Sequence, residues 1–382
     1  MRSLPTSSLM ISPAIAAGTL AHGTNVRFYR PELDALRFFA FLAVLVHHGP
    51  ASPGFPDAVR GIGGFGLSMF FLLSAYLITE LLFLERDRSG TISWGLFFMR
   101  RSLRIWPLYF AALVVGIVVS ELRPGRFGIS PSGVAAMCFF VANQGRLHSQ
   151  LGFVLSPLWS ISIEEQFYLI WPPIVKSGGM RLAFVASILF SVSAGAWIWI
   201  FSSHGWALWY ETPVEFLFFG AGVLFAVAMH EKPIREMSAP VRGGLLTTGL
   251  FSLAVAARFG GVGTANVPGL TRVRLCIGYG AAVAGCALIF SAVLGASHVP
   301  RALSYLGRIS YGLYVFHSGV LQLSLLVTAP LTLAPSSVFN MLTVDAVALA
   351  LCIPAAHLSY RYFERPFLRL KERFKVIASR PA

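Results

Sequence analysis

The stretch PELDALRFFAFLAVLVHHG, residues 31–49, decides the fold class of this chain. Its apolar run begins at Arg37 and reaches His48, with ten residues between the two. A run of this kind predicts a membrane segment, and a histidine inside such a segment is costly unless it has a partner or a function. We therefore predict a membrane protein in which His48 takes part in chemistry.

The composition excludes an ordinary soluble domain. Hydrophobic residues make up 56% of the chain and charged residues only 12%, which a protein with a charged, water-exposed surface does not show. The formal net charge of +14 would indicate nucleic acid only if it formed a basic face on a soluble fold. We therefore expect a lipid bilayer and no nucleic acid as partner. The four cysteines lack metal or redox spacing, and we predict no metal.

The apolar runs predict an all-α, polytopic integral membrane protein with about ten transmembrane helices. Each of these runs is long enough for a helix to cross a core of ~30 Å at ~1.5 Å per residue. A further run at 132–142 has about a dozen residues, so it is predicted to be a short re-entrant or interfacial helix. The ten predicted spans lie near residues 37–53, 64–84, 103–120, 157–175, 182–201, 213–229, 243–258, 275–294, 309–329 and 338–361.

The basic residues predict the sidedness of the chain. With ten spans and both termini in the cytoplasm, most of the 30 lysines and arginines fall on the cytoplasmic side, as the positive-inside rule requires. We divide the chain into a disordered cytoplasmic extension (1–30), a membrane domain (31–366) and a basic cytoplasmic tail (367–382). The first segment also resembles a cleaved signal, but cleavage would leave the next span to orient against its flanking charges.

Three arginines open the third predicted span, in RRSLRIWPLYF at residues 100–110. Arginines at the end of a span usually act as a positive-inside anchor. Guanidinium groups at helical spacing can also bind phosphates through paired hydrogen bonds. Arg100, Arg101 and Arg104 are therefore a candidate site for a phosphorylated cytosolic ligand.

The predicted span at 157–175 begins with LWSISIEEQFYLIWPP, residues 158–173. Ser160, Glu164 and Tyr168 recur every four residues and share one helix face, whereas Glu165 points about 100° away from it. A carboxylate in hydrocarbon needs a partner or a water-filled cavity. A structural ion pair with an arginine is the alternative to a catalytic role for Glu164.

A second intramembrane histidine, His317, lies in LGRISYGLYVFHSGVL at residues 306–321. A buried histidine that satisfies its own hydrogen bonds is the default interpretation of one such residue. However, the rise of ~1.5 Å per residue places His48, Glu164 and His317 at similar depths in a ~30 Å core. We expect these three groups to converge near the middle of the membrane.

These motifs, in this order, resemble those of the acyltransferase-3 family of bacterial membrane O-acyltransferases. The resemblance covers residues 30 to 370 and includes FFLLSAYLI at 70–78 and YRYFERPF at 360–367. Ala75 stands where many members have glycine, a departure that removes no chemistry. We expect the stand-alone form, without the extracytoplasmic hydrolase-like domain of some members, in the bacterial cytoplasmic membrane.

The resemblance implies an O-acetyltransferase that moves an acyl group, usually acetyl, from cytosolic acyl-CoA to a hydroxyl of an envelope or exported carbohydrate. We assign His48 as the general base, with a transient acyl-histidine as the alternative. Glu164 is expected to orient an imidazole or the acceptor, and Arg37 and Asp34 to organise the inner end of the first helix. The donor is expected to contact Arg100, Arg101, Arg104 and Tyr109, and the acceptor Ser160, Tyr168 and His317.

A proton-coupled transporter or exporter is the alternative function, since a mid-membrane histidine and carboxylate also suit proton transfer. A transporter would be expected to show related halves or interrupted helices in corresponding positions, and the sequence contains no convincing internal repeat. The acceptor is left open among O-antigen, exopolysaccharide, lipochitooligosaccharide and a small metabolite.

Overall fold

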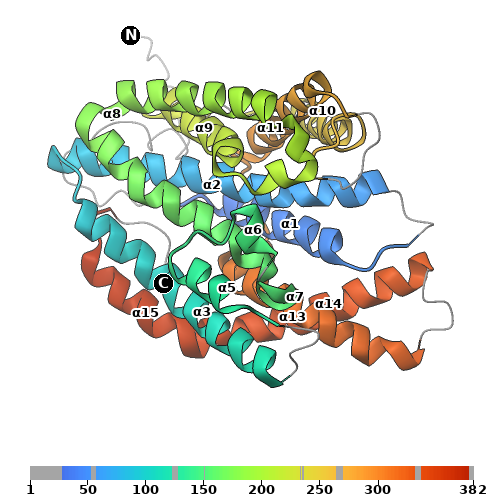
Figure 1. The fold of residues 1–382 in the computed structure, drawn as a ribbon. Coiled ribbons are helices and arrows are strands. Elements are labelled where there is room, and N and C mark those ends of the chain that lie inside the picture. The colour runs from blue at the N-terminus through green and yellow to red at the C-terminus, as the bar shows by residue number, and fades with distance from the viewer. Residues whose placement is uncertain are drawn as a thin grey trace, which may run out of the picture.

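The computed structural model describes residues 28–52, 57–122, 128–149, 151–232, 234, 236–263, 270–331 and 337–377. Every regular element in these ranges is helical (Figure 1). The all-α prediction is therefore confirmed. The predicted N-terminal extension, residues 1–30, lies outside the described residues except for its last three.

Three helices begin the fold: α1 (Pro31–His48), α2 (Asp57–Ser89) and α3 (Trp94–Leu122). Proline suits the first position of α1, because the backbone N–H that proline lacks would have no partner within the helix at this position. The other elements are α5 (Pro131–Cys138), α6 (Gly145–His148), α7 (Gly152–Leu155), η1 (Ser156–Leu158), α8 (Trp159–Ile200), η2 (Ser202–Tyr210), α9 (Thr212–Met229), α10 (Ala239–Arg258), α11 (Arg272–Val293), α12 (Arg301–Arg308), α13 (Ser310–Thr328), η3 (Ala329–Leu331), α14 (Val338–Leu358), η4 (Ser359–Glu364), α15 (Arg365–Lys371) and η5 (Glu372–Phe374).

Helix α8 bends sharply at Gly179, whose φ of 57° and ψ of −142° are not helical. The positive φ suits glycine, and a side chain there would also meet the guanidinium of Arg86. Arg86 braces the bend, because its Nη1 donates a hydrogen bond to the carbonyl of Val175 at 2.8 Å. In Figure 1 the green ribbon of α8 turns back within its length. Because the kink lies at Gly179, the two predicted spans 157–175 and 182–201 lie on either side of it.

The polytopic membrane character is confirmed, whereas the number of ten spans is not. Eight helical stretches among the described residues are long and apolar enough to cross a membrane. Helix α1 is not one of them because its 18 residues include Glu32, Asp34 and Arg37, and α8 contributes one stretch. Helix α5, with 8 residues, would reach only about 12 Å, so the short run near 132–142 forms a short helix as predicted.

Helix α2 lies at the centre of the fold. Of its most apolar 18-residue window, 72% is buried, against 17–50% for the other candidate spans. It packs closely on α1: a Cβ at Gly66 would lie 2.2 Å from the carbonyl oxygen of Ala40, so only glycine allows this approach. On its other side α1 contacts α13 and α14 through Phe41, Leu313 and Ala348. Most of the helix that carries Arg37 and His48 is thus buried or half-buried, although Phe39 is exposed.

The C-terminal segment continues from α14 through η4, which is a turn of π-helix, into α15. Turns of this kind occur often near functional sites. The predicted basic tail, 367–382, therefore begins inside α15, which packs against α3. Residues 378–382 lie outside the described part of the chain.

Candidate active site

A cavity of about 150 Å³ lies at the C-terminal end of α1. We call it the histidine cavity. Its lining residues come from α1, α2, α8, η2, α13 and the segment after α10, and they include His47, His48, Leu67, Trp159, Trp209, Tyr210 and Tyr314. His317 is fully buried directly behind His48, with the two ring centroids 5.0 Å apart. The structure therefore brings together the two histidines that the sequence predicted to converge.

Hydrogen bonds to main-chain carbonyls set the tautomers of both imidazoles. Nδ1 of His48 lies 2.9 Å from the carbonyl oxygen of Val44, and Nδ1 of His317 lies 2.5 Å from that of Tyr314. A carbonyl oxygen only accepts, so each Nδ1 carries the proton and each Nε2 of a neutral ring offers a lone pair. Among the described residues Nε2 of His317 has no hydrogen-bond partner. Nε2 is thus the basic atom of His48.

Arg60 holds the end of α1, a role that no sequence motif indicates. Its Nη2 donates to the carbonyls of His47 at 3.2 Å and Gly49 at 3.0 Å. In return the Nδ1 of His47 lies 2.8 Å from the carbonyl of Arg60. Cationic side chains commonly satisfy the last carbonyls of a helix. The contacts fix the last turn of α1, and with it the position of His48.

A second cavity lies between α1, α2, α3, α8 and α13. We call it the arginine cavity. Its polar lining consists of Arg37, Ser74, Arg101, Arg104, Ser160, Glu164, Tyr168, Ser310, Tyr311 and Tyr314. Ser160, Glu164 and Tyr168 all face it, as their four-residue spacing predicted, whereas Glu165 is not among the lining residues. Three guanidiniums meet one carboxylate here, so the wall carries an excess of positive charge suited to an anion.

Glu164 is held within the arginine cavity rather than beside an imidazole. Its Oε2 accepts from the hydroxyl of Tyr168 at 2.6 Å, and its Oε1 accepts from Ser74 at 3.3 Å. Arg37 also lies in this cavity and pairs with Asp34 at 3.3 Å, which ties it to the first turns of α1. Main-chain carbonyls, not Glu164, orient both imidazoles.

Tyr314 stands between the two cavities. Leu67 and Tyr314 are the residues shared by the two linings. The hydroxyl of Tyr314 donates to the carbonyl of Pro157 at 2.5 Å and lies 2.7 Å from Oγ of Ser160. The histidine and arginine cavities are therefore neighbours, separated by a hydrogen-bonded side chain that the sequence motifs did not single out.

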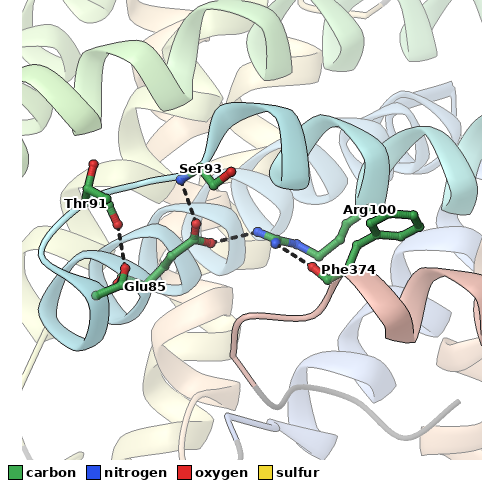
Figure 2. Close-up of polar contacts among 6 residues, drawn as sticks. Glu85, Thr91, Ser93, Arg100 and Phe374 are labelled. Carbon is green, nitrogen blue, oxygen red and sulfur yellow. Dashed lines mark hydrogen bonds and ion pairs between the residues drawn. The ribbon is translucent and has the colours of Figure 1, made fainter.

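Arg100 differs from Arg101 and Arg104, which line the arginine cavity. Figure 2 shows its guanidinium between Glu85 and the main chain of Phe374, with bonds of 2.8 and 3.0 Å. The carboxylate of Glu85 also accepts from the N–H of Ser93 at 2.9 Å. Arg100 thereby joins α2, α3 and η5, and it does not line the cavity. Its predicted role in binding the donor has no geometric support.

Tyr109 also lies away from both cavities. It is fully buried, and its hydroxyl donates to the carbonyl of Met137 at 2.9 Å. Its ring packs on Phe140 with centroids 5.2 Å apart. In the structure Tyr109 connects α3 to the segment around α5, and its proposed contact with the donor remains a prediction without a cavity to support it.

A separate polar cluster surrounds His230, directly after α9. Its Nδ1 lies 2.8 Å from Glu80, and its Nε2 lies 2.9 Å from Asp87. Burial alone lowers the pKa of His230, but the two carboxylates more than offset that and raise it above its ordinary value. Asp87, His230 and Glu231 place ligand atoms within 4.8 Å of one another, yet both ring nitrogens already have carboxylate partners, so we assign no metal.

Comparisons with known proteins identify the family of this chain. The model of the acyltransferase-3 family, described as an acyltransferase domain, matches residues 30–359. The chain is 26% identical over 369 residues to "Peptidoglycan O-acetyltransferase OatA" of Listeria monocytogenes, covering 89% of this chain and 56% of that protein. It is 28% identical over 369 residues to "Putative peptidoglycan O-acetyltransferase YrhL" of Bacillus subtilis, covering 90% and 56%. The chain thus spans just over half the length of these relatives. No solved structure matches it.

Proposed function

The chain belongs to the acyltransferase-3 family, and from that premise we propose that it is a membrane O-acetyltransferase whose two cavities receive the two substrates. The donor would be cytosolic acetyl-CoA, and the acceptor would be a hydroxyl of an envelope or exported carbohydrate. One observation carries this proposal: an imidazole with a basic Nε2 lies in a cavity next to one that gathers three arginines.

The arginine cavity supports binding of the donor. Arg101 and Arg104 lie one helical turn apart on α3, and Arg37 faces them from α1. Guanidinium groups bind phosphate oxygens in pairs, and CoA carries phosphates. In our proposal Arg101 and Arg104 hold these phosphates. Glu164 is fixed by hydrogen bonds from Tyr168 and Ser74, and its negative charge reduces the repulsion between the arginines that line the same cavity.

The histidine cavity supports the chemical step. A thioester is already activated, so the catalyst must mainly deprotonate the attacking hydroxyl and align the two substrates. Nε2 of His48 accepts the proton of the acceptor hydroxyl while the oxygen of that hydroxyl attacks the thioester carbonyl carbon. The new C–O ester bond forms, the C–S bond breaks, and the imidazolium returns its proton to the departing CoA thiolate. The products are an O-acetyl ester and CoA, and His48 is neutral again.

The experiment that tests the proposal uses the purified full chain in lipid vesicles with acetyl-labelled acetyl-CoA and an extract of bacterial envelope glycans. We expect alkali-labile label in the glycan fraction and release of one CoA for each acetyl ester. The transporter alternative predicts that a glycan or small metabolite crosses the vesicle membrane while acetyl-CoA is not consumed. That second result would overturn the proposal.

A further inference from the structure

Aromatic side chains form much of the wall of the histidine cavity. Trp159 comes from the first turn of α8, and Trp209 and Tyr210 come from the end of η2. His48 lies in the same lining, from the end of α1. An acceptor that places a hydroxyl at His48 must therefore lie against aromatic rings.

These rings are held in place before any ligand binds. The ring of Tyr210 lies 4.1 Å from that of His148 and 4.7 Å from that of Trp159, measured between centroids. The indole of Trp209 contacts Phe65 edge-on at 5.7 Å. Burial lowers the pKa of His148 to about 4, so this ring is neutral near pH 7 and adds no charge to the stack.

A chain of hydrogen bonds fixes the backbone that carries Tyr210. Nδ2 of Asn143 donates to the carbonyl of Tyr210 at 3.0 Å and to the hydroxyl of Thr212 at 2.9 Å. Oδ1 of Asn143 accepts from Nε2 of Gln166 at 3.0 Å, which anchors the loop to α8. Preorganised walls of this kind lower the cost of binding.

The size of the cavity limits what can enter. About 150 Å³ is half or less of the roughly 300–1,000 Å³ typical of sites for drug-sized ligands. At Gly64 an added Cβ would lie 3.3 Å from the ring of His47, so the missing side chain is part of the available space. A single sugar ring fits a cavity of this size with both polar and aromatic walls. An acyl chain needs no polar partner, and an oligosaccharide needs more room.

We infer that the histidine cavity binds one pyranose ring of the acceptor, with its C–H face against Trp209 and Tyr210 and a hydroxyl directed at Nε2 of His48. The inference rests on the proposed function and adds the ring form of the acceptor and the residues that recognise it. The aliphatic C–H groups of a pyranose carry slight positive charge, and the faces of aromatic rings carry slight negative charge. The remaining hydroxyls face the polar groups of His47 and Tyr314.

Kinetics with a defined acceptor test the inference. The probe is methyl α-glucopyranoside, compared with the open-chain hexitol glucitol, in vesicles containing the full chain and labelled acetyl-CoA. Trp209→Ala should raise the KM for the pyranoside at least about tenfold, a loss of ~1.4 kcal/mol, with the KM for acetyl-CoA unchanged. Trp199→Ala, on a half-exposed tryptophan of α8, is the matched control and should behave as wild type.

Two further variants guard against misfolding at Trp209. Trp209→Phe keeps a ring against Phe65 and should give an intermediate KM for the pyranoside. Gly64→Ala narrows the cavity from another side and should raise that KM without changing the KM for acetyl-CoA. An unchanged pyranoside KM in folded Trp209→Ala, or equal use of glucitol and pyranoside by the wild type, would overturn the inference.

A binding measurement separates this inference from the proposed function. Saturation-transfer NMR of methyl α-glucopyranoside with the wild-type protein needs no catalysis. Binding that Trp209→Ala weakens, in a protein that transfers no acetyl group, would support the sugar site and reject the acetyltransferase. Acetyl transfer to the pyranoside without any dependence on Trp209 would support the acetyltransferase and reject the sugar site.

Discussion

The imidazole rings of His48 and His317 lie edge to face, with centroids 5.0 Å apart and planes inclined by 65°. Each ring uses its Nδ1–H on a carbonyl of its own helix, so neither ring needs the other as a hydrogen-bond partner. His48 reaches the cavity, whereas His317 is buried behind it. The pair therefore has one member that can meet a substrate and one that shapes its position.

The first prediction follows from this difference. His48→Ala should lower acetyl transfer by about 10²–10⁴-fold, the usual contribution of a general base, with insertion and accumulation unchanged. His47→Ala is the matched control, because the Nδ1 of His47 is directed at the carbonyl of Arg60, and it should lose much less. Transfer by His48→Ala within a few-fold of wild type, measured with labelled acetyl-CoA in vesicles, would remove His48 from the mechanism.

The second prediction separates the three arginines of α3. Arg101→Lys and Arg104→Lys keep the charge but lose the planar guanidinium that binds phosphate in pairs, so the KM for acetyl-CoA should rise about tenfold. Arg100→Lys should leave that KM unchanged and lower the thermal stability instead, because Arg100 bonds to Glu85 and the main chain of Phe374 (Figure 2). The reverse pattern would return Arg100 to the donor site.

The third prediction compares the adjacent carboxylates of α8. Glu164→Gln should reduce kcat/KM by about 10- to 100-fold, the equivalent of one lost charged hydrogen bond of ~1.5–3 kcal/mol. It loses the charge that balances the arginine cavity and one of the two oxygens that accept hydrogen bonds from Tyr168 and Ser74. Glu165→Gln should have a smaller effect, since Glu165 does not line that cavity. Equal losses from both variants would show that the two carboxylates act as a unit.

The fourth prediction concerns stability and pH at His230. Glu80 and Asp87 raise the pKa of His230 above its unfolded value near 6.5. Its stabilising contribution is therefore fully present below about pH 6.5 and is lost as the pH rises through the higher folded-state pKa. The melting temperature should therefore fall as the pH rises above about 6.5, and His230→Gln should remove that part of the dependence.

A surface histidine supplies the control for this measurement. His204 is 45% exposed and lies 3.9 Å from Glu211, in a weaker and more solvated pairing than that of His230. His204→Gln should therefore leave the pH dependence of the melting temperature close to that of the wild type. A His230→Gln variant with the full wild-type pH dependence would show that other groups cause it.

The sequence predicted the helices and the faces of the helices better than the contacts between them. Spacing alone placed Ser160, Glu164 and Tyr168 on one face, and all three line one cavity. Periodicity cannot tell which neighbour a face meets, and so the pattern leaves open whether Glu164 orients an imidazole or the acceptor; in the structure it lies among arginines. Similarly, charge identified the arginines of α3 but not that Arg100 would pair with Glu85 on the preceding helix, α2.

The aromatic wall of the histidine cavity was also beyond the reach of sequence patterns. Trp209 and Tyr210 lie in η2, between α8 and α9, with no motif around them. They reach His48 because α8 turns back at Gly179 and returns the chain to the end of α1, a consequence of tertiary structure. Tyr314 lies in the same motif as His317. An aromatic residue in an apolar helix usually belongs to the core, so the sequence offers no reason to assign it to a cavity.

The last prediction is topological and decides from which side the donor arrives. Ser89, Ser203 and Ser238 are exposed in the structure, so a cysteine at each, in a background without the four native cysteines, reports its side of the membrane. Ser89 bonds to the carbonyl of Glu85, the partner of Arg100, and therefore marks the end of α3 that carries the arginines. Cysteines at Ser89 and Ser238 should react only with cytoplasmic maleimide, and that at Ser203 only with external reagent, because its loop lacks Lys and Arg.

The companion sites Ser336 and Ser379 lie outside the described residues. A cysteine at Ser336 should react with external reagent, and one at Ser379 with cytoplasmic reagent. External labelling at Ser89 would place Arg101 and Arg104 away from cytosolic CoA and refute the proposed route, whereas external labelling at Ser238 alone would invert only the later helices.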